Sequence, residues 1–189
     1  MTASFRTSQV VSAADPTKPH VVLVGLPGSG KSTVGKLLGD RLRRTFLDFD
    51  LEIERRQGMP ITQIFGELGE AGFRELERKL TAELRELGNM VVAPGGGWIS
   101  DPETVALIRP PAIMVYLRLR PETALRRLSA AATARPLLNR PDPLGEMTKL
   151  FEARKDKYQK ADLEVSAEIH TPEQVTQEIA QGLVSRALL

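Results

Sequence analysis

The chain has 189 residues, of which 41% are hydrophobic and 26% are charged. This length predicts one domain with a sizeable core, because a domain of this size buries about 70% of its unfolded surface. The net charge is +2 and cysteine is absent, which gives no overall basic excess for nucleic acid and excludes disulfides and cysteine catalysis.

The N-terminal segment, residues 1–18, is polar and contains no signal-peptide core. We expect it to be a flexible tail, followed by one domain over residues 19–189. No apolar run approaches the ~20 residues that a membrane helix needs. The sequence therefore predicts a cytoplasmic protein with no membrane or nucleic-acid partner.

Short apolar runs alternate with longer amphipathic segments along the chain. The expected strands cover residues 21–24, 45–48, 90–93, 112–117 and 163–165, and the expected helices cover residues 33–43, 61–68, 70–87, 103–108, 121–130, 143–160 and 172–188. Strands alternating with helices are typical of an α/β fold with a parallel sheet covered on both faces. Ser100 or Asp101, Asp142 and Thr171 are the expected N-caps of the helices that follow them.

Residues 25–32 match the phosphate-binding pattern G-x-x-x-x-G-K-[ST], between an expected strand and an expected helix. Small residues allow backbone N–H groups to close around phosphate oxygens. We expect Lys31 to reach the β- and γ-phosphates and the Ser32 hydroxyl to bind Mg²⁺. The residues expected to contact the nucleotide here are Gly28, Ser29, Gly30, Lys31, Ser32 and Thr33.

Two carboxylates, Asp48 and Asp50, follow the second expected strand. Residues i and i+2 of an extended segment point to the same side, so both side chains are expected to face the ligand cleft. One would serve Mg²⁺ and the other the acceptor hydroxyl. The alternative is that both merely cap the helix that includes Glu52 and Ile53.

Three consecutive glycines, residues 95–97, follow the third expected strand. They permit close approach of the backbone to a ligand, or a sharp turn. Trp98 comes next and either walls the acceptor pocket or belongs to the core. Residues 131–142 are rich in small residues, arginine and proline and are predicted to form a mobile loop.

The sequence resembles the shikimate kinases from about residue 19 to the C-terminus. The motifs that carry the resemblance are residues 25–32, Phe46–Glu54, Phe73–Glu77, Gly95–Gly97, Arg135–Leu138, and Arg154 with Tyr158. The phosphate-binding loop alone is widespread, but the combination, in this order and spacing, is specific to the family. The resemblance implies a three-layer α/β/α P-loop kinase fold with a five-stranded parallel sheet, a helical substrate-binding segment at about 49–77 and a mobile lid at about 128–142.

The resemblance also implies the role of each site residue. Asp50 would hydrogen-bond the shikimate hydroxyls, and Asp48 would serve Mg²⁺ through water. Arg74 and Arg154 would grip the shikimate carboxylate, and the turn Gly95, Gly96 and Gly97 would contact shikimate through its backbone. Glu77 would orient Arg74, Arg127 would lie against adenine, and the lid residue Arg135 would close over the phosphates.

Two guanidinium groups suit an acidic substrate, because each donates parallel N–H bonds to a carboxylate. At the level of residues alone, Arg74 and Arg154 could instead lie on solvated helix faces, with Glu70 four residues before Arg74. The family pattern is broken near the last strand, where Ile169 cannot make a polar contact with the nucleotide. His170 is predicted to be a solvated loop residue, and His20 has no evident partner.

The resulting prediction is ATP-dependent phosphorylation of the 3-hydroxyl of shikimate by a stand-alone monomer that uses Mg²⁺. The rival hypotheses are a kinase for another acidic acceptor, such as gluconate, and a nucleotide-binding regulatory module without catalysis. The small net charge conceals a local excess: residues 118–140 hold six arginines and one glutamate. We expect this basic patch to serve the phosphates of the nucleotide.

Overall fold

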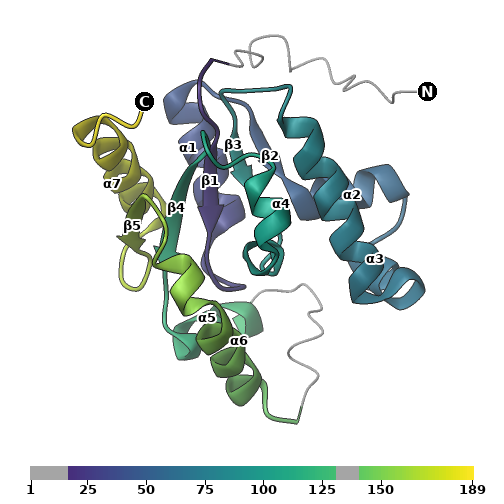
Figure 1. Cartoon of the computed structure of the whole chain (residues 1–189). Coiled ribbons are helices and arrows are strands. Elements are labelled where there is room, and N and C mark those ends of the chain that lie inside the picture. Colours follow the sequence, from purple (N-terminus) through teal and green to yellow (C-terminus); the bar gives the residue numbers. More distant parts are fainter. Residues whose placement is uncertain (1–16, 131–140) are drawn as a thin grey trace.

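A computed structural model describes residues 17–130 and 141–189 (Figure 1). In chain order, its elements are β1 (Val21–Val24), α1 (Lys31–Leu42), β2 (Phe46–Asp48), α2 (Phe49–Gln57), α3 (Ile61–Leu84), β3 (Val91–Ala93), η1 (Trp98–Ser100), α4 (Pro102–Ala106), β4 (Ile113–Arg118), α5 (Pro121–Ala130), α6 (Pro143–Tyr158), β5 (Leu163–Ser166) and α7 (Pro172–Ser185). Residues 1–16 of the expected tail and most of the expected lid, with Arg135, lie outside the described residues.

The five strands form one sheet in the order β2-β3-β1-β4-β5, and every pair is parallel. β1 is central, with Val22 opposite Val92 of β3 on one side and Met114 of β4 on the other. All four residues of β1 are buried, as expected for a strand covered on both faces. The chain leaves β1 for β2 on one side and later crosses to β4 on the other, so β1 marks the point where the strand order reverses.

Helices cover both faces of the sheet (Figure 1). Crossovers between parallel strands are right-handed, so connections that run in opposite directions along the sheet lie on opposite faces. Helix α1 connects β1 to β2 and packs against α7. The connections through α3, α4 and α6 run in the other direction and cover the other face. This arrangement confirms the expected three-layer α/β/α fold.

Helix α6 is fixed to the sheet by a stacked pair of tyrosines. The rings of Tyr116 on β4 and Tyr158 on α6 lie 4.7 Å apart between centroids and are inclined by only 6°. Both residues are almost completely buried, and burial raises the pKa of Tyr116 to about 12. The contact holds the helix that carries Arg154 in a defined position.

Several helices begin or break at the residues that the sequence predicts. Asp101, rather than Ser100, caps α4, and Thr171 with Gln174 forms the expected capping box of α7. Residue 69 separates two expected helices, and the structure has a break there inside α3, where Gly69 adopts φ 66° and ψ −175°. Such a φ is left-handed and favours glycine.

The prediction for His20 was wrong. Its ring is buried, with Nε2 3.0 Å from the carbonyl oxygen of Leu84, and its Nδ1 accepts the backbone N–H of Met90 at 3.3 Å. Burial lowers the pKa of His20, and the ring links the residue before β1 to the end of α3 and to the residue before β3. These partners are 64 and 70 residues away, beyond the reach of local sequence patterns.

Candidate active site

The phosphate-binding loop connects β1 to α1 at the carboxyl edge of the sheet. Gly28 has φ 83°, and a Cβ there would lie 2.7 Å from the carbonyl oxygen of Ala124 in α5. The loop therefore needs glycine at this position both for its backbone conformation and for its contact with α5. Lys31 begins α1, and its Nζ donates to the carbonyl oxygens of Gly25 (3.0 Å) and Leu26 (3.2 Å).

A cavity of about 290 Å³ adjoins this loop and extends toward β5. Its lining includes Gly28, Ser29, Gly30, Thr33 and Arg127, all of which were expected to contact the nucleotide. The Arg127 Nη2 donates to the carbonyl oxygen of Ala167 at 2.7 Å, which places the guanidinium beside the segment that follows β5.

The same cavity revises the expectation for His170 and agrees with that for Ile169. His170 lines the cavity instead of standing free in solvent, and its Nδ1 lies 3.2 Å from the carbonyl oxygen of Ser166. Ile169 is 85% exposed and does not line the cavity. The polar contact that Ile169 cannot provide is therefore available from its neighbour.

Glu168 fastens this segment to the start of α5. Its carboxylate accepts the backbone N–H of Arg120 at 3.0 Å, the Arg120 guanidinium at 3.1 Å and the Thr123 hydroxyl. Burial opposes ionisation, but these hydrogen bonds outweigh it and lower the pKa of Glu168 to about 2. The expected basic patch is thereby reduced, because Glu168 neutralises Arg120 and Glu164 pairs with Arg118.

We expect Glu168→Gln to destabilise the protein in a pH-dependent way. A carboxylate whose pKa falls from 4.5 to about 2 on folding contributes stability above pH 4.5 and loses it as the pH falls toward 2. The difference in free energy of unfolding between wild type and Glu168→Gln should therefore be largest above pH 5 and shrink toward pH 3. Urea titrations at several pH values measure it, with exposed Glu164→Gln as the control. A difference that grows at low pH would contradict the assignment.

The glycine turn after β3 lets charged side chains approach the backbone. A Cβ on Gly95 would lie 2.4 Å from Glu77 Oε1 and 3.1 Å from Asp50 Oδ1. A Cβ on Gly97 would lie 2.0 Å from Arg74 Nη2. Contacts under 3.0 Å are essentially never made by a real Cβ, so a side chain at Gly95 or Gly97 would force Glu77 or Arg74 to move.

Gly96 faces the other side of this turn. A Cβ there would meet Pro27 of the phosphate-binding loop at 3.4 Å and Arg154 Nη1 at 3.7 Å, both ordinary contacts. Arg154 is buried and donates from Nε to the Ser100 hydroxyl at 3.3 Å. Gly96 therefore faces both the phosphate-binding loop and an arginine from α6.

Arg74 makes ion pairs with two glutamates of its own helix. Its Nη2 donates to Glu70 at 3.1 Å, and its Nη1 donates to the buried Glu77. The ion pair between Glu70 and Arg74 that the sequence left open is present, and the Arg74 guanidinium also lies against Gly97. Burial raises the pKa of Glu77, the charge of Arg74 lowers it, and the nearby charge of Asp50 raises it further.

The two aspartates after β2 occupy different positions. Asp48 ends the strand and caps α2, accepting the backbone N–H groups of Asp50 (3.0 Å) and Leu51 (3.4 Å) through Oδ1. Asp50 lies in the first turn of α2, so the two residues do not share one extended segment as expected. Asp50 nevertheless lies next to the glycine turn, because its Oδ1 lies beside Gly95 and its charge acts on Glu77.

Trp98 belongs to the core rather than to an exposed pocket wall. Only 2% of its surface is exposed, and its Nε1 donates to the Thr81 hydroxyl at 3.0 Å. That hydroxyl donates to the carbonyl oxygen of Glu77 at 2.7 Å. The indole therefore ties the glycine turn to the stretch of α3 that carries Glu77.

Thr81→Val should lower the free energy of unfolding by about 1–3 kcal/mol, because it leaves the Trp98 N–H buried without an acceptor. Thr81→Ser keeps the hydroxyl and should lose less. Urea unfolding measures both variants. Equal stability of Thr81→Val and wild type would show that this hydrogen bond contributes nothing.

The residues proposed for Mg²⁺ have suitable chemistry. Ser32 offers a hydroxyl at the start of α1, and Asp48 offers a carboxylate at the end of β2. Within residues 17–130 and 141–189 there is no cluster of three or more metal-binding side chains. Mg²⁺ bound with a nucleotide needs no such cluster, because it keeps several waters and takes other ligands from the phosphates.

A phosphate-binding loop facing a turn flanked by carboxylates and arginines defines a P-loop kinase of a small molecule. The profile described as shikimate kinase matches residues 27–184. The chain belongs to the shikimate kinase family.

Individual relatives agree with this assignment. The shikimate kinase of Aquifex aeolicus (strain VF5) is 40% identical over 169 residues, covering 89% of this chain and 98% of its own length. That of Synechococcus sp. (strain CC9605) is 40% identical over 163 residues, covering 86% and 81%. The structure titled shikimate kinase from Acinetobacter baumannii in complex with shikimate has a TM-score of 0.84 at 35% identity, covering 92% of this chain and 97% of that chain.

A gluconokinase from Sinorhizobium meliloti 1021 matches with a TM-score of 0.62 at 15% identity, which supports a shared fold alone. Among the described residues, no helix is both long and apolar enough to span a membrane.

Proposed function

We propose that this chain transfers the γ-phosphoryl group of ATP to the 3-hydroxyl of shikimate. The observation that carries the proposal is that Gly95–Gly97 has Pro27 of the phosphate-binding loop, Asp50, Arg74 and Arg154 as close neighbours. Family membership supports the same reaction, and one of the similar solved structures is titled as a complex with shikimate.

On the nucleotide side, Lys31 would exchange its contacts with the loop carbonyls for the β- and γ-phosphates of ATP. The dipole of α1 favours the same negative charge at its N-terminus. Arg127, which lines the adjoining cavity, would lie against adenine. Mg²⁺, held by Ser32 and through water by Asp48, would supply charge neutralisation on the phosphates. Arg135, which lies outside the described residues, is proposed to close over them.

On the acceptor side, the shikimate carboxylate would bind between the Arg74 and Arg154 guanidinium groups. Glu77 is buried next to Arg74 and holds it in place. Asp50 would accept a hydrogen bond from the reacting hydroxyl and orient it toward the phosphate. Phosphoryl transfer requires mainly such positioning and charge stabilisation from the protein. We expect closure of the 128–142 segment to exclude water. That the protein is a cytoplasmic monomer stays a prediction.

A coupled assay of ADP release compares shikimate, quinate and gluconate as acceptors at saturating ATP and Mg²⁺. We expect rapid turnover with shikimate and at most weak turnover with the other two. Turnover with gluconate but not shikimate would refute the proposal and favour the rival kinase. ATP binding without turnover on any acceptor would favour the regulatory module.

A further inference from the structure

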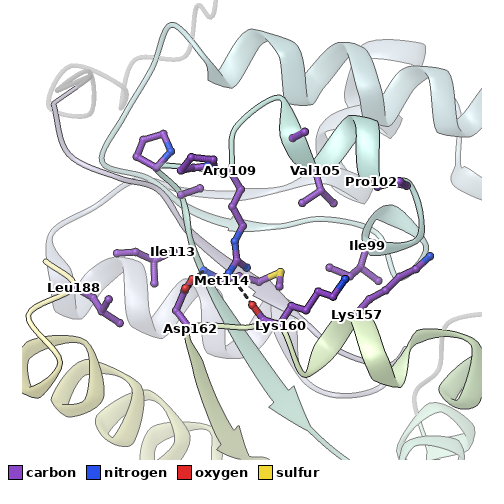
Figure 2. A pocket seen from close by; sticks show the side chains of 14 residues that line it. Ile99, Pro102, Val105, Arg109, Ile113, Met114, Lys157, Lys160, Asp162 and Leu188 are labelled. Carbon is purple, nitrogen blue, oxygen red and sulfur yellow. Dashed lines mark hydrogen bonds and ion pairs between the residues drawn. The ribbon is translucent and has the colours of Figure 1, made fainter.

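A second cavity, of about 650 Å³, lies beside the first residues of β4 (Figure 2). The strands are parallel and the phosphate-binding loop follows the carboxyl end of β1, so this cavity lies at the opposite, amino edge of the sheet. Its volume falls within the 300–1,000 Å³ typical of small-molecule sites. Most of its lining is apolar, with Ile99, Ile113, Met114 and Leu188 among the larger side chains.

More positive than negative charges line this cavity. Arg109, Lys157 and Lys160 supply three positive charges, and Asp162 is the single carboxylate in the lining. Asp162 is already engaged, because it accepts Arg109 Nη2 at 3.1 Å and the backbone N–H of Met114 at 2.7 Å. It therefore compensates Arg109, and two positive charges remain at an apolar cavity.

The two positive charges that Asp162 does not compensate belong to Lys157 and Lys160. Lys157 Nζ donates to the carbonyl oxygen of Ser100 at 2.8 Å, and neither Lys157 nor Lys160 forms an ion pair within residues 17–130 and 141–189. In Figure 2 both lysines lie at the right of the cavity, while Ile113 and Leu188 lie at its left. The two ammonium groups thus lie toward one end of the cavity, next to apolar Ile99, and the other end is apolar.

We infer that this cavity binds a small amphipathic anion, with a carboxylate or sulfonate at Lys157 and Lys160 and an aromatic or branched apolar body against Ile113 and Leu188. An apolar lining with a few convergent polar groups is the general form of a small-molecule site. A neutral ligand with the same apolar body would leave both ammonium groups uncompensated and would bind more weakly.

The inferred site is connected to the acceptor site through Ser100. Its carbonyl oxygen accepts Lys157, and its hydroxyl accepts Arg154 Nε, one turn earlier on α6. An anion that draws Lys157 away from Ser100 loosens the segment that positions Arg154. Binding of the anion in this cavity should therefore raise the KM for shikimate. This effect on KM rests on the proposed function, whereas the binding of the anion does not.

Calorimetric titration of the full chain with 8-anilinonaphthalene-1-sulfonate tests the site, with saturating ADP and Mg²⁺ present to block the nucleotide cavity. N-phenyl-1-naphthylamine, which has the same rings without the sulfonate, is the matched neutral probe. We expect one molecule of the sulfonate to bind per chain. We expect the neutral amine to bind at least about tenfold more weakly. Equal binding of the two probes, or no binding of the sulfonate, would overturn the inference.

Two variants locate the bound probe. Lys160→Glu should weaken sulfonate binding about tenfold or more, and Ala106→Trp, at an exposed lining position, should abolish it by filling the cavity. Lys36→Glu, an exposed lysine on α1, is the charge control and should bind normally. Unchanged binding in Lys160→Glu and Ala106→Trp would place the probe elsewhere and refute the site. Binding at the site without a rise in the KM for shikimate would refute only the connection through Ser100.

Discussion

Asp50→Asn should lower kcat for shikimate phosphorylation by about 10²–10⁴-fold, the range typical of a lost general base or proton acceptor. Asparagine keeps the size of the side chain and removes its charge and its capacity to take a proton. Asp50 lies beside Gly95 and Glu77, where we propose that the acceptor binds, whereas the phosphate-binding loop follows β1. The affinity for ATP should therefore change by less than about twofold, since none of its expected contacts is removed.

Steady-state kinetics with shikimate and equilibrium binding of ATP separate these effects. Asp40→Asn, at an exposed position on α1, is the matched control and should behave as wild type. Near-normal kcat in Asp50→Asn would remove Asp50 from the chemistry and leave it a role in the folding of α2. A large loss of ATP affinity would show that Asp50 acts on the nucleotide side instead.

Gly97→Ala should raise the KM for shikimate by about 10–100-fold, because a displacement near 1 Å of a positioning group can cost 10²-fold. The added methyl group would lie 2.0 Å from Arg74 Nη2 and 2.2 Å from Cζ, so the guanidinium must move. Gly97 has φ −89° and ψ −12°, which alanine adopts readily. The effect is therefore expected on Arg74 and not on the backbone.

The stability of Gly97→Ala distinguishes this explanation from misfolding. The displaced group is the end of a flexible side chain, so the free energy of unfolding should fall by less than about 1.5 kcal/mol. Gly66→Ala on α3, where the added carbon meets nothing within 4 Å, is the control for a glycine substitution nearby. An unchanged KM for shikimate in Gly97→Ala would mean that Arg74 does not bind the acceptor in this position.

The elements and motifs that depend on local pattern could be predicted from the sequence. Alternating strands and helices gave the parallel sheet, and Gly69 separated two helices where the structure has its break. The family resemblance implied that Arg74 and Arg154 bind the substrate carboxylate, whereas the residues alone left solvated helix faces open as the alternative. The structure places both guanidinium groups against the glycine turn.

The parts that could not be predicted depend on contacts between distant segments. Trp98 had two equally open readings until its partner Thr81 was placed on α3. His170 entered the nucleotide-side cavity because the segment after β5 turns toward Arg127 and the phosphate-binding loop. The assumption that Asp48 and Asp50 share a strand failed because α2 begins immediately at Phe49.

The space between Pro27 and Gly96 has a consequence for how the two reactants would meet. Pro27 belongs to the loop expected to hold the donor, and Gly96 belongs to the turn expected to hold the acceptor. A side-chain carbon added to Gly96 would lie 3.4 Å from the Pro27 ring, so the gap between the two has the width of about one methyl group. The two halves of the site therefore approach each other closely at a position where the turn carries no side chain.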